Sequence, residues 1–484
     1  MFVGTASDVG KSVINTGFCR ILKQDGYRPA PFKSQNMSLN SFATPEGLEI
    51  GRAQAVQAEA CGISCHSDMN PVLLKPTNDK SSQVILNGKP IGNQSAYDYF
   101  MGNNKTELFQ EAKSAYGRLS ERYNPIVMEG AGSISELNLK HRDITNMRMA
   151  MYANAATYLV ADIDKGGVFA SVYGSISLLT PEERTFIKGI IINKFRGDAR
   201  LFEEGKKTME ALCGIPVVGI IPFIKDIYIE EEDSVALKNK NRKAEKGKIN
   251  IAVVLLNRLS NFTDFDALEK QEGVHLFYSN DPVEIEQTDI LIIPGSKNTI
   301  ADLIEIKKNG VATAIQNVYR NNKKVIGICG GYQMMGERVE DPHQVEGEVM
   351  QVDGLGLLPV STILSEEKIT KQVTFRFKQY PETCEGYEIH MGITQTNKNE
   401  IPLNRLGSGD TGDGFYLTDS CWGTYIHGIL DNEVVINDLL AGYAKTPTTS
   451  FNYKAFKEQQ YELLANHLRT HLDMEYIYKT LKAE

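Results

Sequence analysis

Residues 1–12 read Met-Phe-Val-Gly-Thr-Ala-Ser-Asp-Val-Gly-Lys-Ser, and apolar residues at helical spacing follow from Val13 to Leu22. A short apolar run, a glycine-bounded loop and a helix start predict a phosphate loop between a strand and a helix. Its backbone N–H groups and the helix N-terminus would surround phosphate oxygens. Lys11 would reach the β- and γ-phosphates, and the Ser12 hydroxyl would bind Mg²⁺.

The loop departs from the usual pattern, because five residues separate Gly4 from Gly10. A glycine-rich turn with a surface lysine is the alternative, and the position between a strand and an amphipathic helix favours the phosphate site. The strand is shorter than usual, so we expect the natural chain to begin a few residues earlier. The residues expected to bind ATP are Gly4, Thr5, Ser7, Asp8, Val9, Gly10, Lys11 and Ser12.

The composition bounds the class of protein. At 484 residues the chain is too long for one core, which predicts two or three domains. It contains neither an apolar run of about 20 residues nor a signal-peptide pattern. Its seven cysteines form no CxxC pair, which argues against a zinc site or a disulfide framework. The scattered cysteines fit a reducing cytoplasm, and the lack of an apolar run argues against a membrane partner. The net charge of −9 argues against nonspecific nucleic-acid binding.

Apolar strands alternate with helices in the first part of the chain, which predicts a parallel sheet covered on both faces. Glu129 follows one of these strands beside glycines, where a carboxylate can hold Mg²⁺ across from Ser12. The polar loop 33–40 follows another strand and is equally consistent with a ligand site and with a solvated surface. The expected strands are 26–32, 125–128, 156–161, 189–192 and 216–221.

A charged segment separates this series from a second one. Residues 233–248 are nearly devoid of apolar groups, which predicts a solvated linker. We therefore expect a first domain over 1–232, a second α/β domain over 249–440, and a helical extension over 441–484 packed on the second domain. The strands expected in the second domain are 249–256, 274–278, 289–293 and 324–328.

The last of these strands ends in Gly327-Ile-Cys329-Gly-Gly331 and runs into a helix. This is the pattern of a nucleophile elbow with sulfur in place of oxygen. A thiol at a helix N-terminus is favoured as thiolate, and backbone N–H groups after Cys329, with others from Gly295-Ser296, can form an oxyanion hole. A buried inert thiol is the alternative, and the strand–elbow–helix context favours the nucleophile.

A cysteine nucleophile needs a base, and histidine is the candidate. His427 follows the expected strand 422–426, at a loop end suited to an active site. His390 lies on an alternating stretch and is the second choice. His467 and His471 lie on the expected C-terminal helices, and we interpret them as structural.

Ten segments together resemble the cobyric acid synthase family, the glutamine-dependent amidases of cobalamin biosynthesis. They read GTASDVGKS, APFKSQNMSLN, MNPVLLKP, EGAGS, DIDKGGVFA, INKFRGD, PGSKNT, GICGGYQMMG, GYEIHMG and YIHGILD. The resemblance implies an α/β fold with an N-terminal P-loop NTPase-like, dethiobiotin synthetase-like domain and a C-terminal class I glutamine amidotransferase-like domain. The first and fourth segments alone would equally suggest dethiobiotin synthetase, which lacks the glutaminase half.

The resemblance also implies two coupled reactions. In the second domain Cys329 attacks the side-chain amide of L-glutamine, with His427 as proton shuttle, and ammonia is released. In the first domain ATP, with Mg²⁺, phosphorylates a carboxylate, and ammonia displaces the phosphate. The implied substrate is adenosylcobyrinic acid a,c-diamide, which is amidated at its b, d, e and g side chains to give cobyric acid.

Individual residues receive roles from the same resemblance. Asp143 would lie close to the reacting carboxylate, and Ser12 and Glu129 would hold the metal. The residues that would bind the acidic corrinoid are Gln35, Asn36, Lys75 and Arg142. Those that would bind glutamine are Gly295, Ser296, Gly330, Tyr332 and Gln333. Many related glutaminases carry His-x-Glu, but residue 429 is Ile, so the orienting group is absent or comes from elsewhere, with Glu388 as the candidate.

Other functions remain open. A partition-type ATPase carries an extra lysine early in the phosphate loop, where this chain has Thr5-Ala6-Ser7, and needs no thiol elbow. An a,c-diamide-forming synthase or a cell-wall amidase would keep the chemistry and change the acid. The segments QNMSLN and MNPVLLKP favour the cobyric acid synthase family over both.

Overall fold

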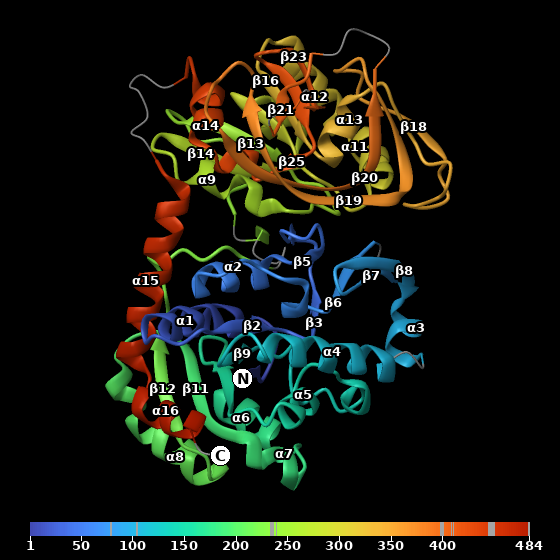
Figure 1. Cartoon of the computed structure of the whole chain (residues 1–484). Helices are drawn as coiled ribbons and strands as arrows, with labels where there is room; N and C mark the ends of the chain where they lie inside the picture. Colours follow the sequence, from blue (N-terminus) through green and yellow to red (C-terminus); the bar gives the residue numbers. More distant parts are fainter. Residues whose placement is uncertain are drawn as a thin grey trace.

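A computed structural model describes residues 1–77, 80–102, 105–232, 237–238, 240–396, 401–407, 409, 411–443 and 451–482. Two α/β halves lie one above the other, and helix α15 (Tyr453–His471) runs along one side of both (Figure 1). No helix in the described ranges combines the length and apolar character needed to cross a membrane.

The first half is built on a parallel sheet, as the alternation of strands and helices predicted. β1 (Phe2–Gly4), β10 (Thr157–Asp162), β11 (Ile187–Phe195) and β12 (Val217–Pro222) lie in that order. β2 (Ala30–Phe32) pairs with β9 (Ile126–Met128), and a parallel bridge from Phe2 to Glu129 joins this pair to β1. The bridge places the carboxyl ends of β1 and β9 side by side, where the phosphate loop and Glu129 begin.

Helices cover this sheet, and smaller strands face the second half (Figure 1). The helices are α1 (Lys11–Gln24), α2 (Arg52–Cys61), α3 (Ala96–Met101), α4 (Lys105–Ser120), α5 (Met147–Tyr152), α6 (Val168–Ser177), α7 (Pro181–Phe186) and α8 (Glu203–Cys213). The smaller strands are the pair β4 (Ser41–Ala43) and β5 (Glu49–Gly51), and the sheet of β3 (Gln35–Met37), β6 (Val72–Pro76), β7 (Ser81–Leu86) and β8 (Lys89–Ser95).

The second half has its own parallel sheet, closed at one edge by an antiparallel strand. Its order is β14 (Val274–Ser279), β13 (Ile249–Val254), β15 (Ile290–Ile293), β16 (Lys324–Ile328), β24 (Cys421–Thr424) and the antiparallel β23 (Phe415–Thr418). The central strands β13, β15 and β16 are almost fully buried and rich in Ile and Val, as expected for a sheet covered on both faces. The helices are α9 (Asp266–Glu269), α10 (Pro282–Glu286), α11 (Thr299–Lys308), α12 (Val311–Arg320), α13 (Gly330–Met335) and α14 (Glu433–Leu440).

A second sheet in this half, which the sequence did not predict, faces the first half. Its long strands β19 (Ser361–Phe377) and β20 (Cys384–Gln395) pair antiparallel and lie along the boundary between the halves (Figure 1). Gln372 of β19 donates a hydrogen bond to the carbonyl of Ala43 in β4, 2.9 Å away. The remaining strands are β17 (Arg338–Glu340), β18 (Gln351–Asp353), β21 (Asn404–Leu406), β22 (Gly412–Asp413) and β25 (Ile426–His427).

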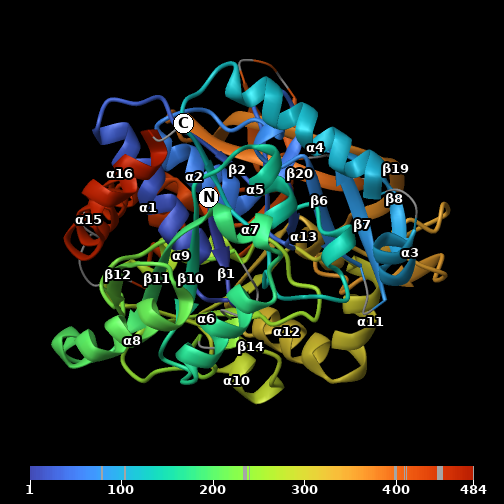
Figure 2. The same ribbon diagram turned by 90° about the horizontal axis from the view of Figure 1, so that it is seen from below.

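The C-terminal helices pack mainly on the first half, so the expectation that they pack on the second domain is wrong. α15 lies beside α1 in both views, with α16 (Met474–Lys482) after it (Figures 1 and 2). Leu464 and Leu468 are fully buried in a core shared with α1, where a Cβ on Gly17 would lie 2.2 Å from Leu468 Cδ1. Only the first turn of α15 reaches the second half's core, through Tyr453 and Phe456. The apolar face of α1 needs a cover, and α15 supplies it.

Where the structure describes it, the charged segment is mostly exposed, as expected of a solvated linker, although Leu237 is buried and Lys240, Arg242 and Ala244 are half-buried. Just before it, Glu230 is buried, with Arg52 Nε 2.7 Å and the Tyr453 hydroxyl 3.1 Å from its oxygens. Within it, Lys240 pairs with Glu269 at 2.6 Å. Residues 233–236 and 239 lie outside the described residues. Glu230, ahead of the segment, can be buried because it pairs with Arg52.

Candidate active sites

Gly10, in the predicted phosphate loop, adopts the left-handed backbone conformation. Gly10 has φ 95° and immediately precedes α1. The Asn193 side chain donates to the Val9 carbonyl at 2.8 Å, and a Cβ on Gly10 would lie 2.2 Å from the same amide nitrogen. The Lys11 ammonium crosses the loop and donates to the carbonyls of Ala6 and Gly132, at 3.0 and 3.1 Å. The loop therefore surrounds a cation next to a helix N-terminus, which suits a phosphate.

Ser12 and Glu129 meet, as the sequence predicted. The Ser12 hydroxyl donates to Glu129 Oε1 at 2.8 Å, and Gln57 Nε2 donates to the other oxygen at 2.8 Å. Lys33, which the sequence analysis did not single out, lies 3.0 Å from Glu129 Oε1. Burial alone would raise the pKa of Glu129, but the charge of Lys33 and the hydrogen bonds lower it. Lys33 follows β2 directly, and this position at a strand end is the signal that could have identified it.

The residues proposed for the corrinoid divide into two groups. Gln35 Oε1 accepts hydrogen bonds from the Tyr99 hydroxyl at 2.6 Å and from Lys105 at 3.3 Å. Burial lowers the pKa of Lys105 to about 7, with the charge of Asp143 opposing this and that of Arg142 adding to it. Lys105 therefore lies near Gln35, Arg142 and Asp143. It belongs to α4, where no sequence motif marks it.

Asp143 anchors the loop in which it lies. Its oxygens accept hydrogen bonds from the backbone N–H groups of Thr145 and Asn146, at 2.7 and 3.1 Å. Burial raises its pKa. The carboxylate is thus held at a fixed position ahead of helix α5.

The side chains of Asn36 and Lys75 contact other partners. Asn36 is buried and donates to Gln54 Oε1 at 3.0 Å. Lys75 donates to Glu49 Oε1 at 2.8 Å and lines a cavity next to Cys329 in the second half. Lys75 therefore lies at the cavity of the glutaminase half, and its role in binding the corrinoid stays a prediction.

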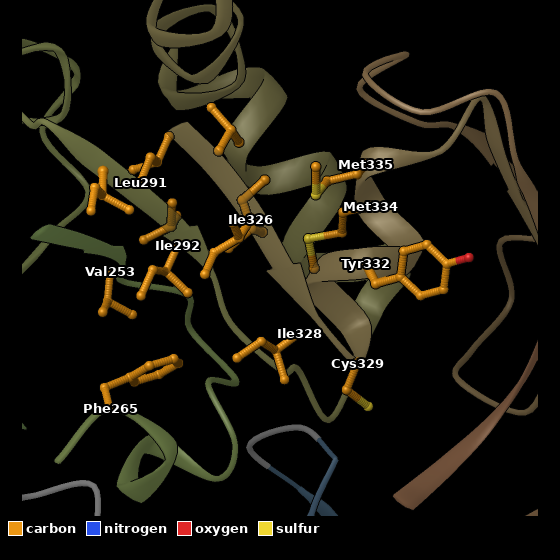
Figure 3. Packing of buried hydrophobic residues seen from close by; sticks show 14 of the residues in the cluster. Val253, Phe265, Leu291, Ile292, Ile326, Ile328, Cys329, Tyr332, Met334 and Met335 are labelled. Atoms are coloured by element: carbon orange, nitrogen blue, oxygen red, sulfur yellow. The ribbon is translucent and has the colours of Figure 1, made fainter. Parts of the chain in front are cut away.

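Cys329 occupies a sharp turn between β16 and α13. Its backbone has φ 52° and ψ −110°, a strained conformation for a residue with a side chain. Figure 3 shows Cys329 at the edge of the buried cluster, with its thiol pointing away from Ile328 and Met334. A Cβ on Gly331 would lie 1.9 Å from the Ile293 carbonyl oxygen, so the turn requires glycine there. This is the elbow geometry that the sequence predicted.

His427 is oriented by Asp264, which the sequence analysis missed. Nδ1 of His427 lies 2.7 Å from Asp264 Oδ2, and the other carboxylate oxygen accepts the Gly428 N–H at 3.0 Å. Burial lowers the pKa of His427, but the charges of Asp264 and Cys329 outweigh it and raise the pKa to about 10. The His427 ring, held by Asp264 on one side, faces the Cys329 sulfur on the other, in the arrangement of a cysteine–histidine nucleophile.

Glu388, the candidate for the group that orients His427, contacts other residues. Its Oε2 lies 3.4 Å from His390 Nε2 and 3.2 Å from Lys371. His390 lines the cavity, but its Nδ1 bonds to the Gly392 carbonyl and its ring stacks on Tyr425. Asp264 instead lies in the short helix Phe262–Phe265, ten residues after β13 ends at Val254, and no motif in the sequence marks it.

The cavity beside Cys329 has a volume of about 60 Å³ and is lined by both halves. Of the residues expected to bind glutamine, Ser296 and Gln333 line it. Gly330 and Gly295 approach it with their backbones: a Cβ on Gly330 would lie 2.8 Å from Ser296 N, and one on Gly295 3.3 Å from His427 Cε1. The Tyr332 ring points away from Cys329 (Figure 3) and packs against Gly423, so the prediction that Tyr332 binds glutamine would have to rest on its backbone.

Comparisons with known proteins agree with these two sites. The chain matches the CobQ/CobB/MinD/ParA nucleotide binding domain over residues 1–237 and the CobB/CobQ-like glutamine amidotransferase domain over 250–435. A protein of Parabacteroides distasonis named cobyric acid synthase is 62% identical, over 100% of this chain and 98% of its own. Proteins of the same name from Bacteroides fragilis and Syntrophobacter fumaroxidans are 60% and 47% identical, each over 99% of this chain and 98% of theirs. The chain therefore belongs to the cobyric acid synthase family.

Proposed function

We propose that this chain amidates the b, d, e and g carboxylates of adenosylcobyrinic acid a,c-diamide, with ATP and glutamine as co-substrates. The observation that carries the proposal is the presence of a phosphate loop and a Cys329–His427 site in one chain of this family. The relatives' name gives the product, cobyric acid, from which we infer the substrate, and the two sites account for the chemistry.

In the glutaminase half, the Cys329 thiolate attacks the amide carbon of glutamine. The His427 imidazolium gives its proton to the departing ammonia, and Asp264 holds the ring in the required orientation. Backbone N–H groups near Gly330 and Ser296 are available for the oxyanion. Water then cleaves the thioester, which releases glutamate and regenerates the thiol.

In the synthetase half, the loop 4–12 and Lys11 bind the phosphates of ATP. The oxygen atoms of Ser12 and Glu129 converge and suit a hard cation, so these residues would hold Mg²⁺, which neutralises phosphate charge. A substrate carboxylate attacks the γ-phosphate, and ammonia displaces phosphate from the acyl phosphate. Phosphate leaves far more readily than hydroxide, which is why the amidation requires ATP.

The acidic corrinoid is placed by the neighbourhood of Gln35, Lys105, Arg142 and Asp143. Lys105 and Arg142 supply positive charge for the carboxylates, and Asp143 lies close to the one that reacts. We also propose a cytoplasmic location, which the seven free cysteines of the chain support.

The test follows amidation by mass spectrometry. Purified protein with ATP, Mg²⁺ and glutamine is given cobyrinic acid a,c-diamide, and each exchange of OH for NH₂ is counted. Cys329→Ser should stop the reaction with glutamine and restore it with added ammonia, whereas Ser12→Ala should impair both. Hydrolysis of ATP and glutamine without a corrinoid product would reject this acid.

A further inference from the structure

Three lysines line the cavity beside Cys329, and they differ in their partners. Lys75 and Lys368 both pair with Glu49, which lies between them. Across the described ranges, the Lys297 ammonium joins no hydrogen bond or ion pair. Its backbone N–H is tied to the Arg258 carbonyl at 2.9 Å, just ahead of helix α11. Lys297 thus presents a cation to the cavity from a fixed point of the backbone.

A cation in this position favours an anionic ligand. Burial lowers the pKa of Lys297, and the positive charge of Lys75 lowers it further. The Glu49 carboxylate already pairs with the ammonium groups of Lys75 and Lys368, so it is not a separate partner for Lys297. A carboxylate brought in by a ligand would compensate the charge of Lys297, because a buried charge is costly without a partner.

Glu346 is the one carboxylate among the described residues that line the cavity. Its Oε2 accepts the backbone N–H of Ile300 at 3.0 Å, and a carboxylate has further acceptor sites. Burial raises its pKa to about 7, with the charge of Lys297 opposing this. Lys297 and Glu346 therefore influence each other electrostatically, yet among the described contacts no ion pair joins them. A ligand that carries both charges on adjacent atoms can satisfy both residues at once.

We propose that Lys297 binds the α-carboxylate of glutamine and that Glu346 accepts its α-ammonium group. The proposal rests on the glutaminase function proposed above and assigns the residues that recognise the amino-acid end of the substrate. With this end held, the side chain extends toward Cys329. Asparagine, which is shorter by one methylene, would not bring its amide to the thiol when its charged end is held in the same place.

The test crosses two variants with two truncated substrates. Glutaramate lacks the α-amino group, and 4-aminobutanamide lacks the carboxylate. Lys297→Met should lower kcat/KM about 10- to 100-fold for glutamine and glutaramate and leave that for 4-aminobutanamide nearly unchanged. Glu346→Gln should lower it for glutamine and 4-aminobutanamide and spare glutaramate. Lys297→Arg should restore part of the loss.

Lys308→Met, on the exposed side of α11, is the matched control and should leave all three values unchanged. An equal loss for every substrate in Lys297→Met would overturn the proposal, since it would indicate a structural role or an effect on the thiolate. If the wild-type protein hydrolyses glutamine but the two variants do not differ in which truncated substrate they spare, only this inference is rejected. A wild-type protein that hydrolyses none of the three would reject the glutaminase function as well.

Discussion

Asp264 Oδ2 lies 2.7 Å from Nδ1 of His427, although 163 residues separate them in the chain. Both side chains are almost fully buried, at 3% and 2% exposed. The contact fixes the proton on Nδ1 and leaves Nε2 for the thiol, as the carboxylate of a catalytic triad does. Asp264 acts through His427 and is therefore a positioning residue.

Asp264→Asn should lower glutamine-dependent amidation by about 10²- to 10⁴-fold, because the amide cannot stabilise the imidazolium. Amidation with added ammonia should remain, since the synthetase half is untouched. The alkaline limb of kcat/KM should also move to lower pH, as the pKa of His427 falls from about 10. Steady-state kinetics with both nitrogen sources measure this.

Glu388→Gln is the matched control, because Glu388 contacts His390 and Lys371. It should retain glutamine-dependent activity and the wild-type pH profile. If Glu388→Gln lost activity and Asp264→Asn did not, the assignment of the orienting group would be reversed.

His427 should also make stability depend on pH. Its pKa is about 10 in the folded chain and about 6.5 in an unfolded one, so the folded state binds its proton more tightly. The resulting stabilisation is complete below pH ~6.5 and is lost as the pH rises through about 10. The difference in unfolding free energy between wild type and His427→Gln should therefore shrink over this range in denaturant titrations. A constant difference would show that the histidine is not held as the imidazolium.

Glu49→Gln should weaken the contact between the halves. Glu49 is fully buried and binds Lys75 of the first half and Lys368 of the second. Burial alone would raise the pKa of Glu49, but the two lysines lower it. Its loss leaves two buried ammonium groups without a counter-ion, at a cost of about 3–5 kcal/mol at pH 7.

The loss of unfolding free energy caused by Glu49→Gln should diminish as the pH falls below about 4.5. At low pH the wild-type Glu49 carboxylate is itself protonated, so its charge no longer stabilises the folded state. Chemical unfolding at several pH values measures this. Glu367→Gln, on the exposed surface of β19, is the control and should change stability by less than about 0.5 kcal/mol. A small, pH-independent effect of Glu49→Gln would contradict the prediction.

Two neighbouring leucines test the packing of α15. Leu464 is fully buried against the first half, and Leu463 is 41% exposed. Leu464→Ala should cost about 2–5 kcal/mol of unfolding free energy, while Leu463→Ala should stay within about 0.5 kcal/mol. Equal effects would show that α15 does not pack on the first half as described.

Gly331→Ala should damage the elbow. The new Cβ would lie 1.9 Å from the Ile293 carbonyl oxygen, so either β15 or α13 must shift. We expect a loss of about 1–3 kcal/mol or more and of glutaminase activity. Gly117→Ala, in helix α4 with open space around the new methyl group, should instead stabilise the protein by about 0.5–1 kcal/mol. Thermal unfolding and glutaminase assays compare the two, and a harmless Gly331→Ala would refute the steric argument.

Features encoded within one segment could be predicted from the sequence. The phosphate loop before α1 and the elbow at Cys329 each consist of a strand, a glycine-bounded turn and a helix in direct succession. Backbone sterics and hydrogen bonding act over these few residues, so their order specifies the geometry. The buried strands of both parallel sheets were predictable for a similar reason, since their apolar runs mark them.

Only the tertiary structure decided which distant segments meet. Asp264 reaches His427 because β13 and the segment after β24 end at the same edge of the sheet. Lys75 lies at the cavity of Cys329 because the two halves close over it, and α15 covers α1 because its apolar face fits there. No local pattern of charge or hydrophobicity specifies these partners. They follow from how the sheets and helices pack, where burial and charge pairing select one arrangement.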